Sequence, residues 1–103
     1  MAIEVHHNPQ RSRYEVTVDG EPAGFAAYRD TDGAQVFTHT EVDDAFEGQG
    51  VGSALARGAL DDVRDRGGRL VPLCPFIAAY IDRHPQYADL VDADLAARLR
   101  PSA

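Results

Sequence analysis

A glycine-rich segment, Glu47 to Ala54, is the part of the chain whose residue types and spacing most directly suggest chemistry. It reads Glu-Gly-Gln-Gly-Val-Gly-Ser-Ala and stands between a strand-like pattern and a helix-like one. Glycines leave backbone N–H groups unobstructed, and the unpaired N–H groups and the dipole at a helix N-terminus attract anions such as phosphate. The third glycine of the dinucleotide-binding fingerprint is missing, because Ser53 occupies its position. We therefore expect an anion site here, with a simple flexible turn as the alternative.

The single cysteine, Cys74, is a candidate nucleophile. It follows a short apolar run, Arg69 to Leu73, and precedes Pro75, which suits the first turn of a helix. A thiol at the start of a helix is favoured as the reactive thiolate when it is exposed. Two interpretations stay open: Cys74 accepts an acyl group as a covalent intermediate, or it is a small buried hydrophobic residue.

The histidines do not suggest a metal site. His6 and His7 are adjacent on a predicted strand, so their side chains point to opposite faces and cannot chelate one ion together. One cysteine and four dispersed histidines have no zinc-site spacing. We expect no metal.

The composition excludes several classes of function. All ten basic residues among the 103 are arginine, so a lysine-containing phosphate-binding loop, a lysine Schiff base and a pyridoxal phosphate anchor are ruled out. Seventeen acidic residues give a net charge of −7, which argues against a general nucleic-acid binder. The chain has no run of roughly eighteen apolar residues and no start typical of a signal peptide. We expect one cytoplasmic domain over residues 1–103, without a membrane partner and without disulfides.

The first forty residues predict strands joined by turns. Residues 3–7 and 13–18 are strand-like, and Asp19-Gly20 then predicts a hairpin to a strand over 23–28. Asp32-Gly33 leads into residues 35–42, which we expect to be the longest strand. Hairpin-linked neighbours of this kind imply an antiparallel meander.

After Val42 the apolar period changes from two to about 3.6, which predicts helices. Val51, Leu55, Ala59 and Val63 repeat every four residues, Gly67-Gly68 supplies a stop, and Asp62–Arg66 and Asp61–Arg64 are expected to pair on the outer face. Residues 69–73 predict a buried strand parallel to its neighbour, followed by a helix from Pro75 to His84 and a third over 89–99. The fold class is therefore α/β (α+β), with a mixed, mostly antiparallel five-stranded sheet and helices packed on it.

Two motifs resemble one enzyme family. Gln49 to Ala54 fits the Q/R-x-x-G-x-G/A signature of the GCN5-related N-acetyltransferases, between a strand and a helix as that family requires. Residues 71–87, with Pro-Leu-Cys-Pro-Phe and His-Pro-x-Tyr, look like a stretch of the family's small YjdJ-like subgroup, and His39 to Val42 matches the subgroup's preceding strand. The resemblance covers roughly residues 4–91.

The resemblance implies acetyl-CoA as the acetyl donor. Its pyrophosphate would lie on the backbone amides of six residues, Gln49, Gly50, Val51, Gly52, Ser53 and Ala54. Its pantetheine arm would run beside the strand at Thr40 and Val42, with the thioester between Glu41 and Cys74. Arg57, one turn into the helix, could add a cation near the phosphates or simply pair with Asp61 on the surface.

Acetylation of an amine also needs groups that move protons. Glu41 is the candidate base, and we expect it to share a strand face with Phe37 and His39, so that Glu41 and His39 could hold a water between them. Tyr80 aligns with the family tyrosine that protonates the leaving thiolate. The alternatives are a solvated Glu41, a hydrogen-bonded His39 at the core edge and a Tyr80 that only fills the apolar helix face.

The acceptor side is expected to be open, because the chain has no room for the family's first helical pair and last two strands. The negative charge would suit a cationic small amine or a basic peptide, or would serve solubility alone. We expect a monomer or a weak homodimer. The alternative function is a non-catalytic module that binds acyl-CoA or senses acetyl-CoA.

Overall fold

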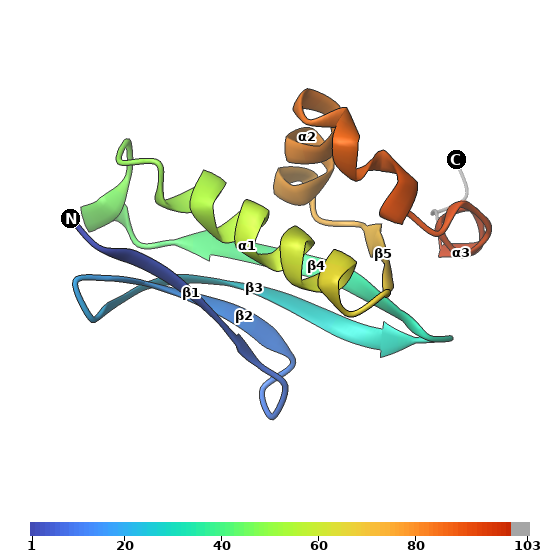
Figure 1. Cartoon of the computed structure of the whole chain (residues 1–103), viewed down its shortest axis with the longest axis horizontal. Helices are drawn as coiled ribbons and strands as arrows, with labels where there is room; N and C mark the ends of the chain where they lie inside the picture. Colours follow the sequence, from blue (N-terminus) through green and yellow to red (C-terminus); the bar gives the residue numbers. More distant parts are fainter. Residues whose placement is uncertain (100–103) are drawn as a thin grey trace.

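A computed structural model describes residues 1–99 and contains one five-stranded sheet in the order β1-β2-β3-β4-β5 (Figure 1). The first four strands are antiparallel neighbours, and the fifth is parallel to the fourth. Their bounds are β1 Ile3–Asn8, β2 Arg13–Val18, β3 Glu21–Thr31, β4 Ala34–Val42 and β5 Arg69–Pro72. The predicted fold class, a mixed and mostly antiparallel sheet with packed helices, is confirmed.

Two-residue turns join β2 to β3 and β3 to β4. Asp19-Gly20 and Asp32-Gly33 all have positive φ angles, between 50° and 84°, which is the backbone of a hairpin turn that matches the strand twist. β3 spans 11 residues and β4 spans nine. β3 is the longer strand because it lies between the two tight turns and extends up to both of them. The expectation that the strand after Asp32-Gly33 is the longest was therefore wrong.

A bulge in β4 reverses which side chains face α1. Ala27 pairs with His39 but Tyr28 pairs with Phe37, so Thr38 is an extra residue. Phe37 is consequently buried on the helix-covered face, whereas His39 is exposed on the other. The prediction that Phe37 shares a face with His39 and Glu41 was wrong for Phe37, because strict alternation does not survive a bulge.

The main helix, α1 (Val51–Asp65), packs across one face of the sheet (Figure 1). A Cβ at Gly58 would lie 2.8 Å from the side chain of Val5, so the glycine permits close approach to β1. The predicted apolar stripe is confirmed, since every member is buried: Val51, Leu55, Ala56, Ala59, Leu60 and Val63.

Two further helices complete the chain. α2 spans Pro75–Arg83 and packs on the α1 side, and the short 3-10 helix η2 (Pro85–Leu90) follows it. α3 spans Ala93–Leu99, so the third helix begins later than expected, because Asp92 accepts a hydrogen bond from the Leu95 amide and caps it. Within residues 1–99, no helix combines the length and apolarity that a bilayer crossing requires.

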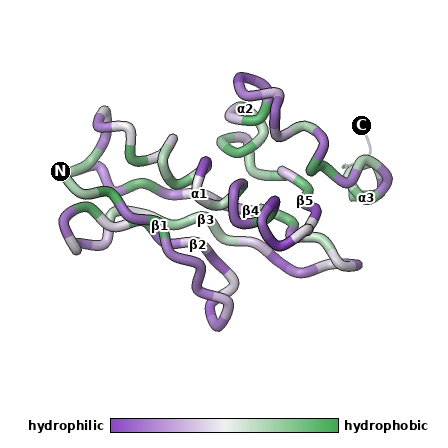
Figure 2. The backbone as a smooth tube through the Cα atoms, viewed as in Figure 1, coloured by the Kyte–Doolittle hydropathy of each residue, from purple (hydrophilic) through white to green (hydrophobic). Residues whose placement is uncertain are grey.

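The sheet is covered unequally on its two faces. Leu95 of α3 packs on Ala34, Val36 and Val71, opposite α1. Among the described residues, no helix covers this second face over β1, β2 and β3 (Figure 1), and Figure 2 shows polar segments along the same strands. A broad part of the sheet is thus open to solvent.

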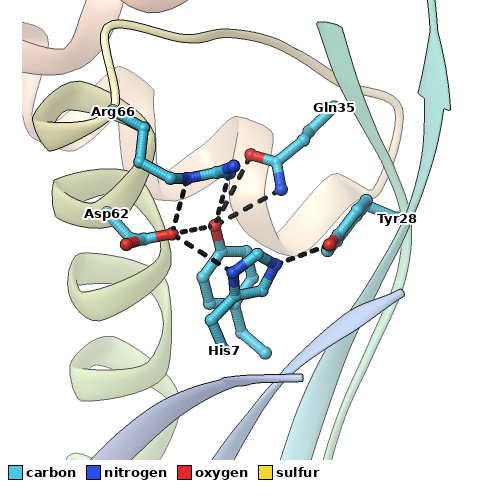
Figure 3. Close-up of polar contacts among 6 residues, drawn as sticks. His7, Tyr28, Gln35, Asp62 and Arg66 are labelled. Carbon is cyan, nitrogen blue, oxygen red and sulfur yellow. Dashed lines mark hydrogen bonds and ion pairs between the residues drawn. The ribbon is translucent and has the colours of Figure 1, made fainter. Parts of the chain in front are cut away.

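Polar side chains anchor the C-terminal half of α1 to the first four strands (Figure 3). The Tyr14 hydroxyl donates to Asp62 at 2.6 Å and accepts from the Arg66 guanidinium at 3.2 Å. Burial and the Asp62 carboxylate together raise the pKa of Tyr14 to about 12. The other members are His7, Tyr28 and Gln35.

Of the two ion pairs expected on α1, one is present. Arg66 lies 3.0 Å from Asp62, as predicted. Arg64 instead pairs with Asp89 at 2.9 Å, and Asp61 accepts a hydrogen bond from Tyr87 at 2.6 Å. The Asp61–Arg64 prediction was wrong because η2 brings better placed partners to both side chains.

Candidate functional site

The loop before α1 ends in a backbone arrangement suited to anions. Gly50 is the N-cap residue with φ 78°, a left-handed conformation that favours glycine. The first intrahelical bond runs from the Ala54 amide to the Gly50 carbonyl at 3.0 Å. The amides of Val51, Gly52 and Ser53 therefore have no partner within the helix. The expected set of anion-binding amides is corrected at Ala54, whose amide is already engaged.

A cavity of about 400 Å³, the loop cavity, lies beside these amides. One wall of the loop cavity is Phe76, in the first turn of α2. A Cβ at Gly52 would lie 2.7 Å from its ring, so this glycine makes room for the aromatic wall. Gln49 is exposed in the loop. The lining residues come from β4, the loop, α1 and α2: Thr40, Val42, Phe46, Glu47, Gly48, Gly50, Val51, Gly52, Ser53 and Phe76.

The edge of β4 runs past the end of β5 next to this cavity. The two strands pair only from Ala34 to Phe37, and the Cys74 amide then donates to the Phe37 carbonyl at 2.9 Å. Thr40, on the α1 face after the bulge, places its hydroxyl 3.1 Å from the Cys74 sulfur. Cys74 itself is only 4% exposed. Of the β4 candidates, Thr40 is therefore the residue that contacts the Cys74 thiol.

Glu41 and His39 lie together on the opposite face of the sheet. Their side chains are 3.0 Å apart in direct contact, and both are more than half exposed. No bridging water is needed to join them. Because Glu41 and Cys74 are on opposite faces, a reacting group between them would have to lie at the strand edge near Thr40.

Tyr80 borders another cavity of about 400 Å³, between α1 and α2. Its ring is buried and stacks on His84 with 4.0 Å between the ring centroids. Arg57 lines the same cavity, together with Gly50 and Ser53, which also line the loop cavity. The predicted cation and the predicted phenol are thus both near the start of α1.

Comparison with known proteins decides the family. The sequence-family model of the GCN5-related N-acetyltransferases matches residues 13–90. The chain belongs to this family. Protein NATD1 of Mus musculus is 31% identical over 85 residues, which are 81% of this chain and 77% of that protein. NATD1 of Xenopus tropicalis is 30% identical over 86 residues, with 82% and 79% covered, and NATD1 of Homo sapiens is 29% identical over 85 residues, with 81% and 75% covered.

The match to the GCN5-related N-acetyltransferases includes every candidate of the site. Residues 13–90 contain β4, the loop, α1, α2 and η2 completely. The resemblance that the sequence motifs suggested is thereby confirmed at the level of the family. Within the described residues, no three or more histidine, cysteine, aspartate or glutamate side chains are grouped so that they could hold a metal ion.

Proposed function

We propose that this protein is an N-acetyltransferase that uses acetyl-CoA and acetylates an amine. The observation that carries the proposal is the joint position of the α1 amides and the β4 edge. Val51, Gly52 and Ser53 offer amides without helical partners at the loop cavity, and Thr40 and Val42 line that same cavity from the strand. A phosphate group and an amide-rich chain such as the pantetheine arm need these two kinds of surface side by side.

The residues present fit this donor. The loop backbone at Gly48 and Gly50 is open, since a Cβ at either position would meet nothing within 4 Å. The amides and dipole of α1 would hold the phosphates, and Arg57 would add a cation from the adjoining cavity. This arrangement suits a chain without lysine and with a net charge of −7.

Each candidate side chain has a role in the transfer. The Cys74 thiolate, which the second step regenerates, would bond to the acetyl carbon while the thioester C–S bond of the donor breaks, and Tyr80 would protonate the departing thiolate. The acceptor amine would then bond to the acetyl carbon as the Cys74 C–S bond breaks. Glu41, supported by His39, would take the proton that the amine loses. Direct transfer to the amine, without acetyl-Cys74, uses the same donor site.

The alternative is a module that binds acyl-CoA without turnover. It is favoured by one observation: Cys74 is almost fully buried and lies across the sheet from Glu41. The loop cavity alone would suffice for this function. Turnover therefore has to be tested separately from binding.

Binding is tested by thermal unfolding with acetyl-CoA. Ligand at 100 times its Kd raises the free energy of unfolding by about 2.7 kcal/mol. Ser53→Glu adds a carboxylate at the third helical position, where it suits the helix dipole but repels phosphate. We expect this variant to fold normally and to bind at least about fivefold more weakly, on the order of 1 kcal/mol. Ser53→Gln is the neutral control, and the absence of any shift with wild type at millimolar ligand would overturn the proposal.

The covalent step is tested by intact mass after incubation with acetyl-CoA. We expect wild type to gain one acetyl group and Cys74→Ser to gain none, since the chain has no lysine to compete. A panel of polyamines, amino acids and basic peptides then measures released CoA. Turnover in Cys74→Ser at the wild-type rate would show direct transfer. If wild type binds acetyl-CoA but releases no CoA with any amine, the result would support the non-catalytic binding module instead.

A further inference from the structure

The uncovered face of the sheet carries a large cavity, the outer groove, of about 830 Å³. Its walls come from β2, β3, β4 and the start of the 3-10 helix η1 (Asp44–Phe46). That volume is within the range of small-molecule sites, roughly 300–1,000 Å³. The side chains that give it its character are Arg13, Glu15, Phe25, Glu41, Asp43 and Asp44.

The outer groove and the loop cavity meet at β4. Thr40 and Val42 line both cavities, although the groove is formed mainly by the opposite face of the sheet. The shared wall is the part of β4 that continues beyond β5, where the Thr40 hydroxyl touches Cys74. A molecule in the groove can therefore approach the same strand edge that the proposed donor would follow.

The charges of the groove favour a cation. Glu15, Glu41, Asp43 and Asp44 supply four carboxylates against the single guanidinium of Arg13. Arg13 already pairs with Glu15 at 2.7 Å, and this hydrogen bond holds the pKa of Glu15 below its ordinary value. The carboxylates nearest the shared wall belong to β4 and η1.

The groove wall already holds one cation of the chain itself. The Arg13 guanidinium lies over the Phe25 ring, 4.7 Å from its centroid, while it pairs with Glu15. An aromatic face beside a carboxylate is a general way to bind organic cations. On the neighbouring strand, Glu41 pairs in register with Phe25, and its partner His39 lies with 5.9 Å between its ring centroid and that of Phe25.

We propose that the outer groove binds the acceptor, and that the acceptor is a small linear amine with two or more amino groups. This inference rests on the proposed acetyltransferase function. The distal ammonium groups would bind the carboxylates, and the reacting amine would lie in its neutral form at the Thr40 end. Its nitrogen would bond to the acetyl carbon as the C–S bond to that carbon breaks, and Glu41 would take the proton that the nitrogen loses.

The test measures spermidine binding by calorimetry without any acetyl donor. Asp44→Asn removes a carboxylate of the groove that has no assigned part in the chemistry. Glu41→Gln removes a second carboxylate, that of the proposed base. We expect each variant to bind about threefold more weakly and the double variant about tenfold more weakly. Asp82→Asn, an exposed charge on α2 outside the groove, is the matched control and should bind like wild type.

The outcomes separate the groove from the donor site. Equal losses in Asp82→Asn and Asp44→Asn, or no spermidine binding by wild type, would overturn the groove proposal even if acetyl-CoA binds. Spermidine binding that depends on Asp44, in a protein that acetyl-CoA does not stabilise, would support the groove and overturn the acetyltransferase proposal. If both hold, Asp44→Asn should raise the KM for spermidine about threefold with kcat unchanged. Turnover of basic peptides with no binding of spermidine would assign the groove to a different acceptor and overturn this one.

Discussion

Thr40 is the residue at which the features of the candidate site converge. This residue lines both the loop cavity and the outer groove, and its hydroxyl is 3.1 Å from the Cys74 sulfur. The bulge at Thr38 is what turns this hydroxyl toward the thiol. A hydroxyl at this position can donate a hydrogen bond to the sulfur, and hydrogen bonds to an anionic acceptor are in general the stronger ones.

Replacement of Thr40 therefore tests the environment of Cys74. Thr40→Val keeps the shape and removes the donor, so the rate of Cys74 alkylation by iodoacetamide should fall about threefold to tenfold at neutral pH. Thr40→Ser, which keeps the hydroxyl, should restore most of the rate. Mass spectrometry of the alkylated protein over time gives the rates, and equal rates in all three proteins would contradict the role of the hydroxyl.

At the scale of elements, polar contacts hold α1 to the sheet at the end opposite the loop cavity. The N-terminus of α1 carries the candidate amides, but its polar anchors lie near the other end, where Asp62 and Arg66 meet Tyr14 (Figure 3). His7 adds to this cluster by stacking on Tyr14, with 4.4 Å between ring centroids. The helix is thus fixed to β1 and β2 by polar contacts at a distance from the glycine loop.

This anchoring predicts a loss of stability at alkaline pH. The folded state keeps Tyr14 protonated up to a pKa of about 12, whereas the unfolded chain releases this proton near the ordinary tyrosine pKa of 10.0. The contribution is fully present below pH 10 and is lost as the pH rises through about 12. One such tyrosine makes the free energy of unfolding fall by at most about 1.4 kcal/mol per pH unit in this range.

Urea unfolding between pH 9 and pH 11.5 measures this slope. Tyr14→Phe should be less stable at pH 9, because Asp62 loses one of its two hydrogen-bond donors, and should show a shallower decline than wild type. The decline should not vanish, since burial and the Asp61 hydrogen bond also raise the pKa of Tyr87 to about 12. Parallel curves for wild type and Tyr14→Phe would show that Tyr14 does not carry the effect.

For the molecule as a whole, the distribution of charge matters more than its sum. The net charge of −7 would repel the phosphates of the proposed donor, yet the loop offers amides and a helix dipole that need no lysine. The same acidity is useful on the outer face, where carboxylates gather beside Phe25. The sheet separates these two environments. The proposed anionic donor and the proposed cationic acceptor would therefore approach the edge of β4 from opposite faces of the sheet.

Local residue preferences made much of this molecule predictable. The Asp-Gly turns, the apolar stripe of α1, the glycine loop and Pro75 in the first turn of α2 all depend on residues a few positions apart. For this reason the mixed sheet, the helix positions and the glycine loop before α1 follow from the sequence, and two motifs sufficed to suggest the family.

Only the tertiary structure decided how the site is put together. The bulge at Thr38 appears when β3 and β4 pair, and it moved His39 and Glu41 to the face opposite Phe37. The contact of Thr40 with Cys74 joins residues 34 positions apart, through the parallel pairing of β4 with β5. The outer groove likewise exists because three strands curve together while α3 covers only Ala34, Val36 and Val71. These features depend on strand register and on packing between distant segments, whose energies no local pattern of residues contains.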